Sequence, residues 1–142
     1  MFAGENPFET GIALPTGNGK VGFTLRREIG EAIANDLLAT TNDNKTYEIT
    51  GSESYSYAEV ASELSKLSGK TISYTDVNPD VYTDFIKQII VPQQYIEMFS
   101  AFATDIKNNQ HNKVTADLEN LLGRKSITFS LKSSTRFSKK TI

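Results

Sequence analysis

The segment 45–69 constrains the fold of this chain most, because it predicts a strand, a turn and a helix in immediate succession. Tyr47 and Ile49 alternate with polar residues, which is typical of a strand with one face toward solvent. Gly51 ends that strand, and the helical part of the segment follows within a few residues. We therefore expect 45–51 to be a central strand of an α/β unit.

The helix in this segment has clear start and stop signals. Ser56 and Glu59 have the spacing of a capping box, and Gly69 is suited to a left-handed helix end. Its expected buried face consists of Tyr57, Val60, Ala61, Leu64 and Leu67. None of these residues needs a chemical role, so the segment predicts a globular α/β fold and says little about activity.

Similar patterns predict the other elements. We expect strands at 20–25 and 70–77, and a helix after Arg26 that buries one apolar face. That face consists of Ile29, Ala32, Ile33 and Leu37. Further helices are expected after Asn78-Pro79, with Phe85 on the inner face, after Pro92, and between a Thr115 cap and Gly123. The segment 1–15 has no strand or helix of clear period, and Asn18-Gly19 favours a turn with positive φ. This alternation predicts parallel strand pairing, with a helical lobe formed by the second half.

Composition excludes several classes of function. The 142 residues suit one domain, and 15 basic against 17 acidic side chains give no electrostatic reason to expect nucleic acid as a partner. Cysteine is absent, and the single histidine, His111, leaves little for a metal site. His111 lies in a polar loop, so we expect its side chain to be exposed and without a role. No apolar run reaches the roughly 20 residues of a membrane helix, and the first residues do not resemble a signal peptide. We expect a cytoplasmic protein.

Two motifs of nucleotide-dependent enzymes match poorly. The stretch 17–22 reads Gly-x-Gly-x-x-Gly, but it precedes a predicted strand, whereas a dinucleotide site needs the motif between a strand and a helix. We interpret it as a loop. In short-chain dehydrogenases a lysine four residues after the catalytic tyrosine assists proton transfer. None of the six tyrosines here has a lysine at that position, so Tyr55 and Tyr57 are expected to pack and cap.

Charged and aromatic groups have structural alternatives. Glu28 and Glu31 share a helix face, where paired carboxylates can do acid–base work but more often complement the helix dipole. Arg26 and Arg27 could hold a phosphate or a substrate carboxylate, although a solvated strand end is the favoured explanation. The stripe formed by Tyr95, Met98, Phe99 and Phe102 is more typical of core than of a ligand wall, unless part of it faces a cleft.

The order and spacing of several short segments resemble the C-terminal half of the NmrA-like, atypical short-chain dehydrogenase family. This family includes type 2 NAD(P)H:quinone oxidoreductases and triphenylmethane reductase. The matching segments are 17–23 (GNGKVGF), 26–32 (RREIGEA), 47–51 (YEITG), 56–61 (SYAEVA), 68–70 (SGK) and 121–124 (LLGR). The resemblance implies an α/β fold, a partial Rossmann-like parallel sheet made of the C-terminal strands, with a helical substrate lobe.

The resemblance also implies that an N-terminal Rossmann half, with the cofactor fingerprint, is absent here. Residues 1–125 would form the C-terminal part with the substrate lobe, and 126–142 a divergent, frayed tail. No cofactor is then expected in this chain, although NAD(P)H serves the parent family. The expected substrate-cleft residues are Asn6 and Phe8, which match a family segment near the nicotinamide, together with Arg27 and Glu28. The last two depart from the family pattern of a basic or polar residue followed by aspartate.

Three hypotheses follow. The first is that the chain is the substrate-lobe portion of an NAD(P)H-dependent, quinone reductase-like oxidoreductase and is inactive alone. The alternative is a non-catalytic, redox-sensing or protein-interaction module of the same family. The third is a free-standing α/β enzyme centred on Arg27 and Glu28. The expected partner is a second copy of the chain or the missing Rossmann half, which would cover an exposed sheet edge or face. Neither a membrane nor a metal ion is expected.

Overall fold

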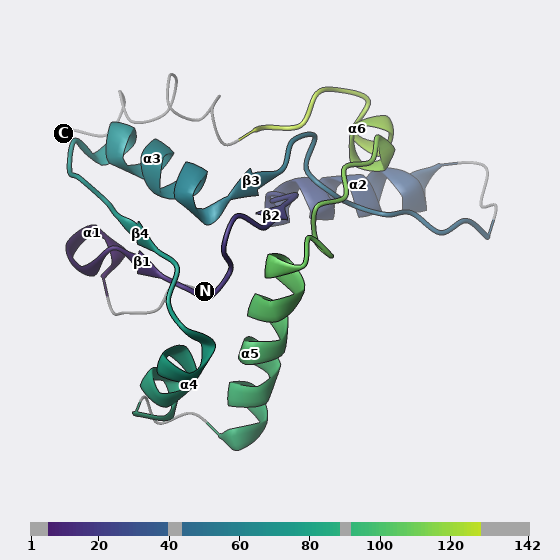
Figure 1. Cartoon of the computed structure of the whole chain (residues 1–142). Coiled ribbons are helices and arrows are strands. Elements are labelled where there is room, and N and C mark those ends of the chain that lie inside the picture. The colour runs from purple at the N-terminus through teal and green to yellow at the C-terminus, as the bar shows by residue number, and fades with distance from the viewer. Residues whose placement is uncertain (1–5, 40–43, 89–91, 129–142) are drawn as a thin grey trace. The chain divides into compact units, whose positions relative to one another are not determined.

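The computed structural model describes residues 6–39, 44–88 and 92–128 (Figure 1). The chain divides into two units, which are described separately. The first unit comprises residues 1–21 and 55–112, and the second comprises 22–54 and 113–142. Both units are assembled from segments that are distant in sequence.

The described strands of the first unit form two short pairs. Strand β1 (Ile12–Ala13) is parallel to β4 (Tyr74–Thr75), with Ile12 opposite Tyr74. Strand β2 (Lys20–Val21) is antiparallel to β3 (Tyr55–Ser56). The predicted α/β class with a small parallel sheet is confirmed, although its first strand lies in a segment where no strand was expected.

The strand predicted at 45–51 is wrong. The Glu48 N–H donates to the Asp117 carboxylate at 2.9 Å, and the Gly51 N–H donates to the Gly22 carbonyl at 3.2 Å without forming a strand. The Tyr47 hydroxyl donates to Asp36, also at 2.9 Å. The strand predicted at 20–25 shortens to Lys20–Val21. Alternating hydrophobicity does not by itself supply the neighbouring strand that a sheet requires.

Four described helices belong to the first unit, α1 (Pro7–Thr10), α3 (Tyr57–Ser68), α4 (Pro79–Gln88) and α5 (Gln93–Lys107). The capping box of α3 is confirmed, since the Ser56 hydroxyl accepts from the Glu59 N–H at 3.2 Å and Glu59 accepts from the Ser56 N–H at 2.7 Å. Gly69 ends α3 with φ +68°. Thus the local start and stop signals of α3 act as the sequence predicts.

Helices α4 and α5 pack against each other, and a Thr83–Ser100 hydroxyl contact of 3.2 Å lies between them (Figure 1). Their buried residues are Tyr82 and Ile86 on α4 and Ile96 and Ala103 on α5. The predicted core positions Phe85, Tyr95, Met98 and Phe102 are exposed instead. The helices therefore meet along a narrower stripe than their apolar faces offer.

In the second unit, α2 (Arg26–Leu38) packs against α6 (Asp117–Leu122) around Ala32, Leu118 and Leu122. Ile33 and Leu37 were expected to be buried but are 53% and 72% exposed. Both lie on a different face of α2 from its buried residues, which are Glu28 and Ala32. Within this unit, α2 buries only the face that α6 covers.

Thr115 does not cap α6 as predicted, because its hydroxyl donates to the Glu48 carbonyl and Ala116 is the N-cap residue. Its N–H also donates to the Thr50 hydroxyl at 2.8 Å. Gly123 ends α6 with φ +66°, as expected. Among the described helices, none is long and apolar enough to span a lipid bilayer.

Candidate functional site

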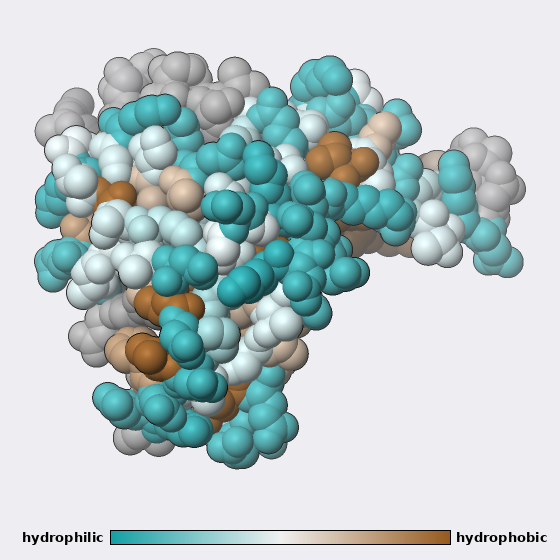
Figure 2. Space-filling view, in the orientation of Figure 1, coloured by the Kyte–Doolittle hydropathy of each residue, from teal (hydrophilic) through white to brown (hydrophobic). Residues whose placement is uncertain are grey.

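A cavity of about 220 Å³ lies in the first unit and is mainly apolar and aromatic. The loop between β1 and β2, the starts of α3 and α4, helix α5 and the loop after α5 all contribute to its walls. Figure 2 shows hydrophobic atoms breaking the hydrophilic surface in the part of the view that α4 and α5 occupy. The lining residues are Leu14, Thr16, Val21, Tyr57, Tyr82, Phe99, Phe102, Ala103, Ile106 and His111.

The loop between β1 and β2 is held by a hydroxyl network. The Thr16 and Tyr74 hydroxyls lie 3.0 Å apart, and the Tyr74 hydroxyl also contacts the carbonyls of Leu14 at 3.2 Å and Gly17 at 3.0 Å. The Gly19 N–H donates to the Thr16 carbonyl at 3.0 Å. These contacts hold Leu14 and Thr16 in the cavity wall.

Glycine at position 19 permits this loop to approach α5 closely. A Cβ at Gly19 would lie 1.9 Å from the Ile106 carbonyl oxygen, which is far inside van der Waals contact. A Cβ at Gly22 would similarly lie 2.9 Å from the Lys113 carbonyl oxygen. Close approach to the Ile106 carbonyl thus explains Gly19, and close approach to the Lys113 carbonyl explains Gly22. The positive φ of the turn falls on Gly17, at +52°, rather than on Asn18 or Gly19 as expected.

His111 departs from its sequence-based expectation. Asn109 adopts φ +59° and reverses the chain after α5, and its amide oxygen accepts from the Lys20 N–H at 3.4 Å. The reversal turns His111 toward the cavity, where its ring centroid lies 6.2 Å from that of Phe102. Its Nε2 is buried and has no hydrogen-bond partner among the described residues. The expectation that His111 is exposed was therefore wrong, whereas the expectation that it has no role stays a prediction.

Two tyrosine phenols, of Tyr57 and Tyr82, belong to the polar part of the cavity wall. Burial raises the pKa of the Tyr57 phenol, with further contributions from Tyr82 and Tyr74. Burial alone raises the pKa of Tyr82. Both phenols therefore keep their protons at neutral pH. No aspartate, glutamate, lysine or arginine lines the cavity in the described part of the chain, so its chemistry suits a neutral ligand.

Two of the predicted cleft residues lie in the first unit at α1. The Asn6 side chain accepts from the Phe8 N–H at 3.1 Å, and the Phe8 ring is exposed. Neither is among the residues that line the cavity. Arg27 and Glu28, the other two, lie at the start of α2 in the second unit. Their assignment to a substrate cleft stays a prediction.

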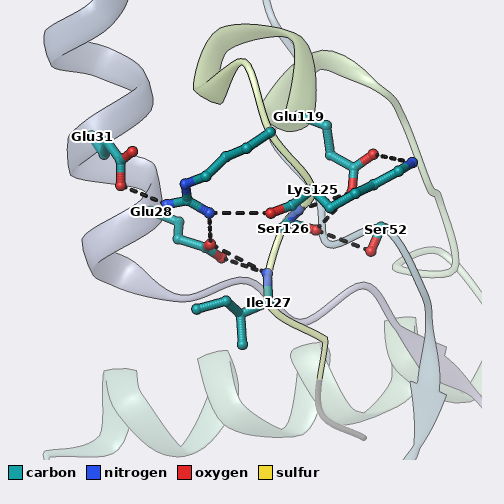
Figure 3. A network of polar contacts seen from close by, with 8 residues as sticks. Glu28, Glu31, Ser52, Glu119, Lys125, Ser126 and Ile127 are labelled. Atoms are coloured by element: carbon teal, nitrogen blue, oxygen red, sulfur yellow. Dashed lines mark hydrogen bonds and ion pairs between the residues drawn. The ribbon is translucent and has the colours of Figure 1, made fainter. Parts of the chain in front are cut away.

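Glu28 belongs to a polar network within the second unit (Figure 3). Its carboxylate is 1% exposed and binds Arg124 Nη1 at 2.7 Å, while both of its oxygens accept from the Ile127 N–H at 3.2 Å. The other arm of the Arg124 guanidinium binds Glu31 at 2.6 Å. Glu28 and Glu31 together raise the pKa of Arg124. The i,i+3 carboxylates thus hold one guanidinium.

Glu119 fastens the following residues in the same way. It binds Lys125 at 2.9 Å and accepts from the Ser126 N–H at 2.9 Å, and these bonds lower its pKa. The Ser126 hydroxyl donates to Ser52 at 3.0 Å. The first residues of the segment set aside as a tail are therefore anchored, while 129–142 lie outside the described residues. In the described chain, no cluster of three or more His, Cys, Asp or Glu side chains is placed to hold a metal ion.

Comparison with known proteins identifies the relatives of this fold. No family model matches the chain. It is 29% identical over 117 residues to festuclavine synthase I of Penicillium roqueforti, covering 81% of this chain and 40% of that protein. A solved NADPH-dependent quinone oxidoreductase of Escherichia coli superposes with a TM-score of 0.81 at 22% identity, over 92% of this chain and 48% of the other. Triphenylmethane reductase of Citrobacter gives 0.78 at 27% identity, over 89% and 46%.

The resemblance to the NmrA-like reductases is confirmed. The chain spans less than half the length of these relatives, as the coverage of 40% for festuclavine synthase I shows. The Escherichia coli enzyme has also been solved with NADPH, and the Citrobacter reductase with NADP(H). The similarity to oxidoreductases agrees with the fold, while the site residues described above come from the structure of this chain.

Proposed function

We propose that this chain is the substrate-binding portion of an NAD(P)H-dependent oxidoreductase of the quinone reductase type and does not transfer hydride alone. The aromatic cavity of the first unit carries this proposal, because it offers a neutral, largely apolar wall to a small planar substrate. The relatives that reduce quinones or dyes support the same class of reaction.

The nicotinamide cofactor and the cavity residues of this chain have separate roles in the proposed reaction. A bound nicotinamide supplies the hydride, whereas this chain's cavity residues orient a neutral substrate and exclude water. A Cβ at Gly19 or Gly22 would collide with a backbone carbonyl of this chain, which supports a packing role for these glycines over contact with a pyrophosphate. The nicotinamide site is therefore assigned to a part of the enzyme other than the stretch 17–22.

The test is NAD(P)H oxidation by the purified 142-residue chain with a small quinone as acceptor. We expect no rate above that of the protein-free mixture with either NADH or NADPH. The Escherichia coli quinone oxidoreductase serves as the positive control under the same conditions. Quinone-dependent turnover by this chain that rises in proportion to its concentration would contradict the proposal.

A second candidate function is a non-catalytic interaction module, and one observation favours it. Ile33, Leu37 and Leu38 of α2 are exposed apolar side chains, and a surface of this kind commonly contacts a second protein. The proposed partner is a second copy of the chain or a cofactor-binding half supplied separately. Light scattering across a range of concentrations tests self-association, and a monomer at every concentration would leave only the separate half.

A further inference from the structure

We propose that the Tyr82 hydroxyl is the polar anchor of the first unit's cavity, and that the cavity binds a small neutral ring compound whose carbonyl oxygen accepts a hydrogen bond from this hydroxyl. This inference rests on the proposed function for the identity of the cavity as a substrate site. The binding step itself needs no cofactor, so it is measurable on the chain as it exists.

The Tyr82 hydroxyl is nearly enclosed and yet open to the cavity. The side chain lines the cavity, and the residue is 5% exposed. The hydroxyl has no hydrogen-bond partner among the described residues, and burial is the cause that raises its pKa. In the described chain, His111 Nε2 is the unpartnered side-chain polar atom that has no accessible surface, so the Tyr82 oxygen retains some. A ligand that bonds to this oxygen supplies the partner that the fold leaves out.

Other polar groups of the cavity wall are less available to a ligand. The Thr16 hydroxyl lies 3.0 Å from the Tyr74 hydroxyl, and His111 Nε2 has no surface that a ligand could reach. Tyr57 lies near Tyr82, because the Tyr82 phenol contributes to the raised pKa of Tyr57. The two phenols therefore form one polar region in a wall that is otherwise mainly apolar.

A phenol that keeps its proton selects a hydrogen-bond acceptor. Burial raises the pKa of Tyr82 above its ordinary value, so this group is a neutral O–H donor throughout the neutral pH range. A ketone or quinone carbonyl oxygen is an acceptor with two lone pairs and carries no charge. Hydrogen bonding to the Tyr82 hydroxyl would thus orient the carbonyl end of such a compound within the cavity.

The size and lining of the cavity select a ring. Phe99, Phe102 and Ile106 line it from α5. An apolar protein cavity of about 150 Å³ binds benzene, so the 220 Å³ here suits a single ring with one or two small substituents. Edge-to-face and offset contacts with the two phenylalanine rings favour a planar ligand over an aliphatic one. Phe102 is 48% exposed, so the cavity opens to solvent beside this ring.

The charge of the cavity selects a neutral ligand. Its described lining lacks Asp, Glu, Lys and Arg. A carboxylate or an ammonium ion entering the cavity would therefore lose hydration without gaining a counter-ion. A neutral carbonyl compound avoids this penalty, since its oxygen exchanges a bond to water for one to the Tyr82 hydroxyl.

Hydrogen bonds at the start of α4 fix the position of Tyr82. The Asn78 side chain accepts from the Asp80 N–H at 2.8 Å, and the Asn78 carbonyl accepts from the Tyr82 N–H at 3.0 Å. The next residue, Thr83, contacts the Ser100 hydroxyl of α5 at 3.2 Å. Tyr82 is therefore held in the cavity wall before any ligand arrives, which reduces the entropy lost on binding.

The experiment compares acetophenone with ethylbenzene, which share a ring and differ in that a carbonyl group replaces a methylene group. Both are titrated into the full 142-residue chain with its six tyrosines labelled with ¹³C at Cζ, and benzoate is the anionic probe. The Cζ atom carries the hydroxyl, so its NMR signal responds when the hydroxyl gains a hydrogen bond. We expect acetophenone to shift the Tyr82 signal strongly, ethylbenzene to shift it little, and benzoate not to bind.

A Tyr82→Phe variant keeps the ring at this position and removes the hydroxyl. We expect the ratio of the acetophenone Kd to the ethylbenzene Kd to rise about fivefold, as the loss of one hydrogen bond predicts. Tyr95→Phe is the matched control, because it removes the same group from an exposed tyrosine of α5 that does not line the cavity. That variant should leave the ratio unchanged. Should Tyr82→Phe not fold, the wild-type Cζ signal decides by itself.

A Tyr82 Cζ signal that responds equally to acetophenone and ethylbenzene, or to neither, would overturn the proposal. An unchanged Kd ratio in a folded Tyr82→Phe variant would do the same, as would tight binding of benzoate. These outcomes are separate from those of the hydride-transfer test. Quinone-dependent NAD(P)H oxidation by the chain alone would overturn the proposed function and leave the anchoring role of Tyr82 intact.

Discussion

The two units of this chain treat a buried polar group in opposite ways. In the second unit, the Glu28 carboxylate is almost fully buried and has Arg124 and the Ile127 N–H as partners. In the first unit, His111 Nε2 is buried among aromatic rings without a partner in the described residues. A buried polar group with partners stabilises the fold, whereas one without a partner costs free energy. The contrast assigns a stabilising role to the second unit's network and none to the buried nitrogen of His111.

The largest expected effect is a loss of stability in the first unit, caused by a substitution where the loop between β1 and β2 lies close to the backbone of α5. In Gly19→Ala, the new Cβ collides with the Ile106 carbonyl, so the loop between β1 and β2 must move away from α5. We expect a loss of about 3 kcal/mol in the free energy of unfolding, since a backbone neighbour does not yield as a flexible side chain does. Urea denaturation measures it. A loss below about 0.5 kcal/mol would show that the loop does not pack so closely.

The next effect removes the satisfied carboxylate of the second unit. Glu28→Ala leaves the Ile127 N–H without its acceptor and leaves Arg124 Nη1 with only the Lys125 carbonyl at 3.1 Å, so we expect a loss of about 2 kcal/mol by urea denaturation. Glu31→Ala is the matched control, because Glu31 binds the same guanidinium from an exposed position on the same helix. That variant should lose less than about 1 kcal/mol. Equal losses for the two variants would contradict the special role of the buried carboxylate.

A smaller effect is the dependence of the folding stability on pH, to which the two units contribute through different side chains. Lys125 and Ser126 lower the pKa of folded Glu119, so the stability it contributes is present above its unfolded pKa and is lost as pH falls through the folded value. Burial raises the pKa of Tyr82 above 10.0, its ordinary value, so the unfolded chain ionises first and stability falls as pH rises beyond that value.

Thermal unfolding from acid to alkaline pH measures both limbs. Glu119→Gln should flatten the acid limb, and Tyr82→Phe should flatten the alkaline limb without changing the acid one. Glu59 in the first unit also has a lowered pKa, chiefly through its bond to the Ser56 backbone, and it leaves a residual acid limb in both variants. An alkaline limb that Tyr82→Phe does not alter would show that this phenol ionises as readily in the folded chain as in the unfolded one.

The smallest effect is a gain in stability. Gly30 lies within α2, and a Cβ there would meet nothing within 4 Å among the described residues. Gly30→Ala should therefore stabilise the chain by about 1 kcal/mol, since alanine restricts the unfolded chain and favours a helix. A higher midpoint of urea unfolding is the readout. A loss of stability instead would indicate a close neighbour at this face of α2, such as the partner discussed above.

Local signals in the sequence predicted the helices well. The Ser56–Glu59 capping box, the glycine at 69 and the glycine at 123 are all placed as their residue types require. The strands were predicted poorly, because a two-residue bridge such as β1–β4 depends on a partner more than 60 residues away in the chain. Burial on α2 and α5 was also overestimated, since hydrophobic periodicity marks a candidate face but not how much of it a neighbour covers.

The candidate site was likewise predicted only in part from the sequence. The aromatic stripe of α5 was recognised, with a ligand wall as its less favoured interpretation, and the structure places Phe99 and Phe102 in a cavity wall. His111 was missed because its loop is polar and its position depends on the left-handed Asn109. The Asn-Asn pair at 108–109 was the one available signal, since asparagine tolerates that conformation better than most residues.

By itself, the sequence determined the boundaries of α3, the C-terminal end of α6, the α/β class and the similarity to reductases, because caps, breakers and short motif spacings act over a few residues. The tertiary structure alone decided which polar groups are satisfied and which face a cavity. Arg124 reaches Glu28 across 96 residues of sequence, and His111 lines the same cavity as the loop between β1 and β2 only after the chain reverses at Asn109. Such contacts depend on where distant segments pack, and no local sequence pattern encodes which of these segments meet.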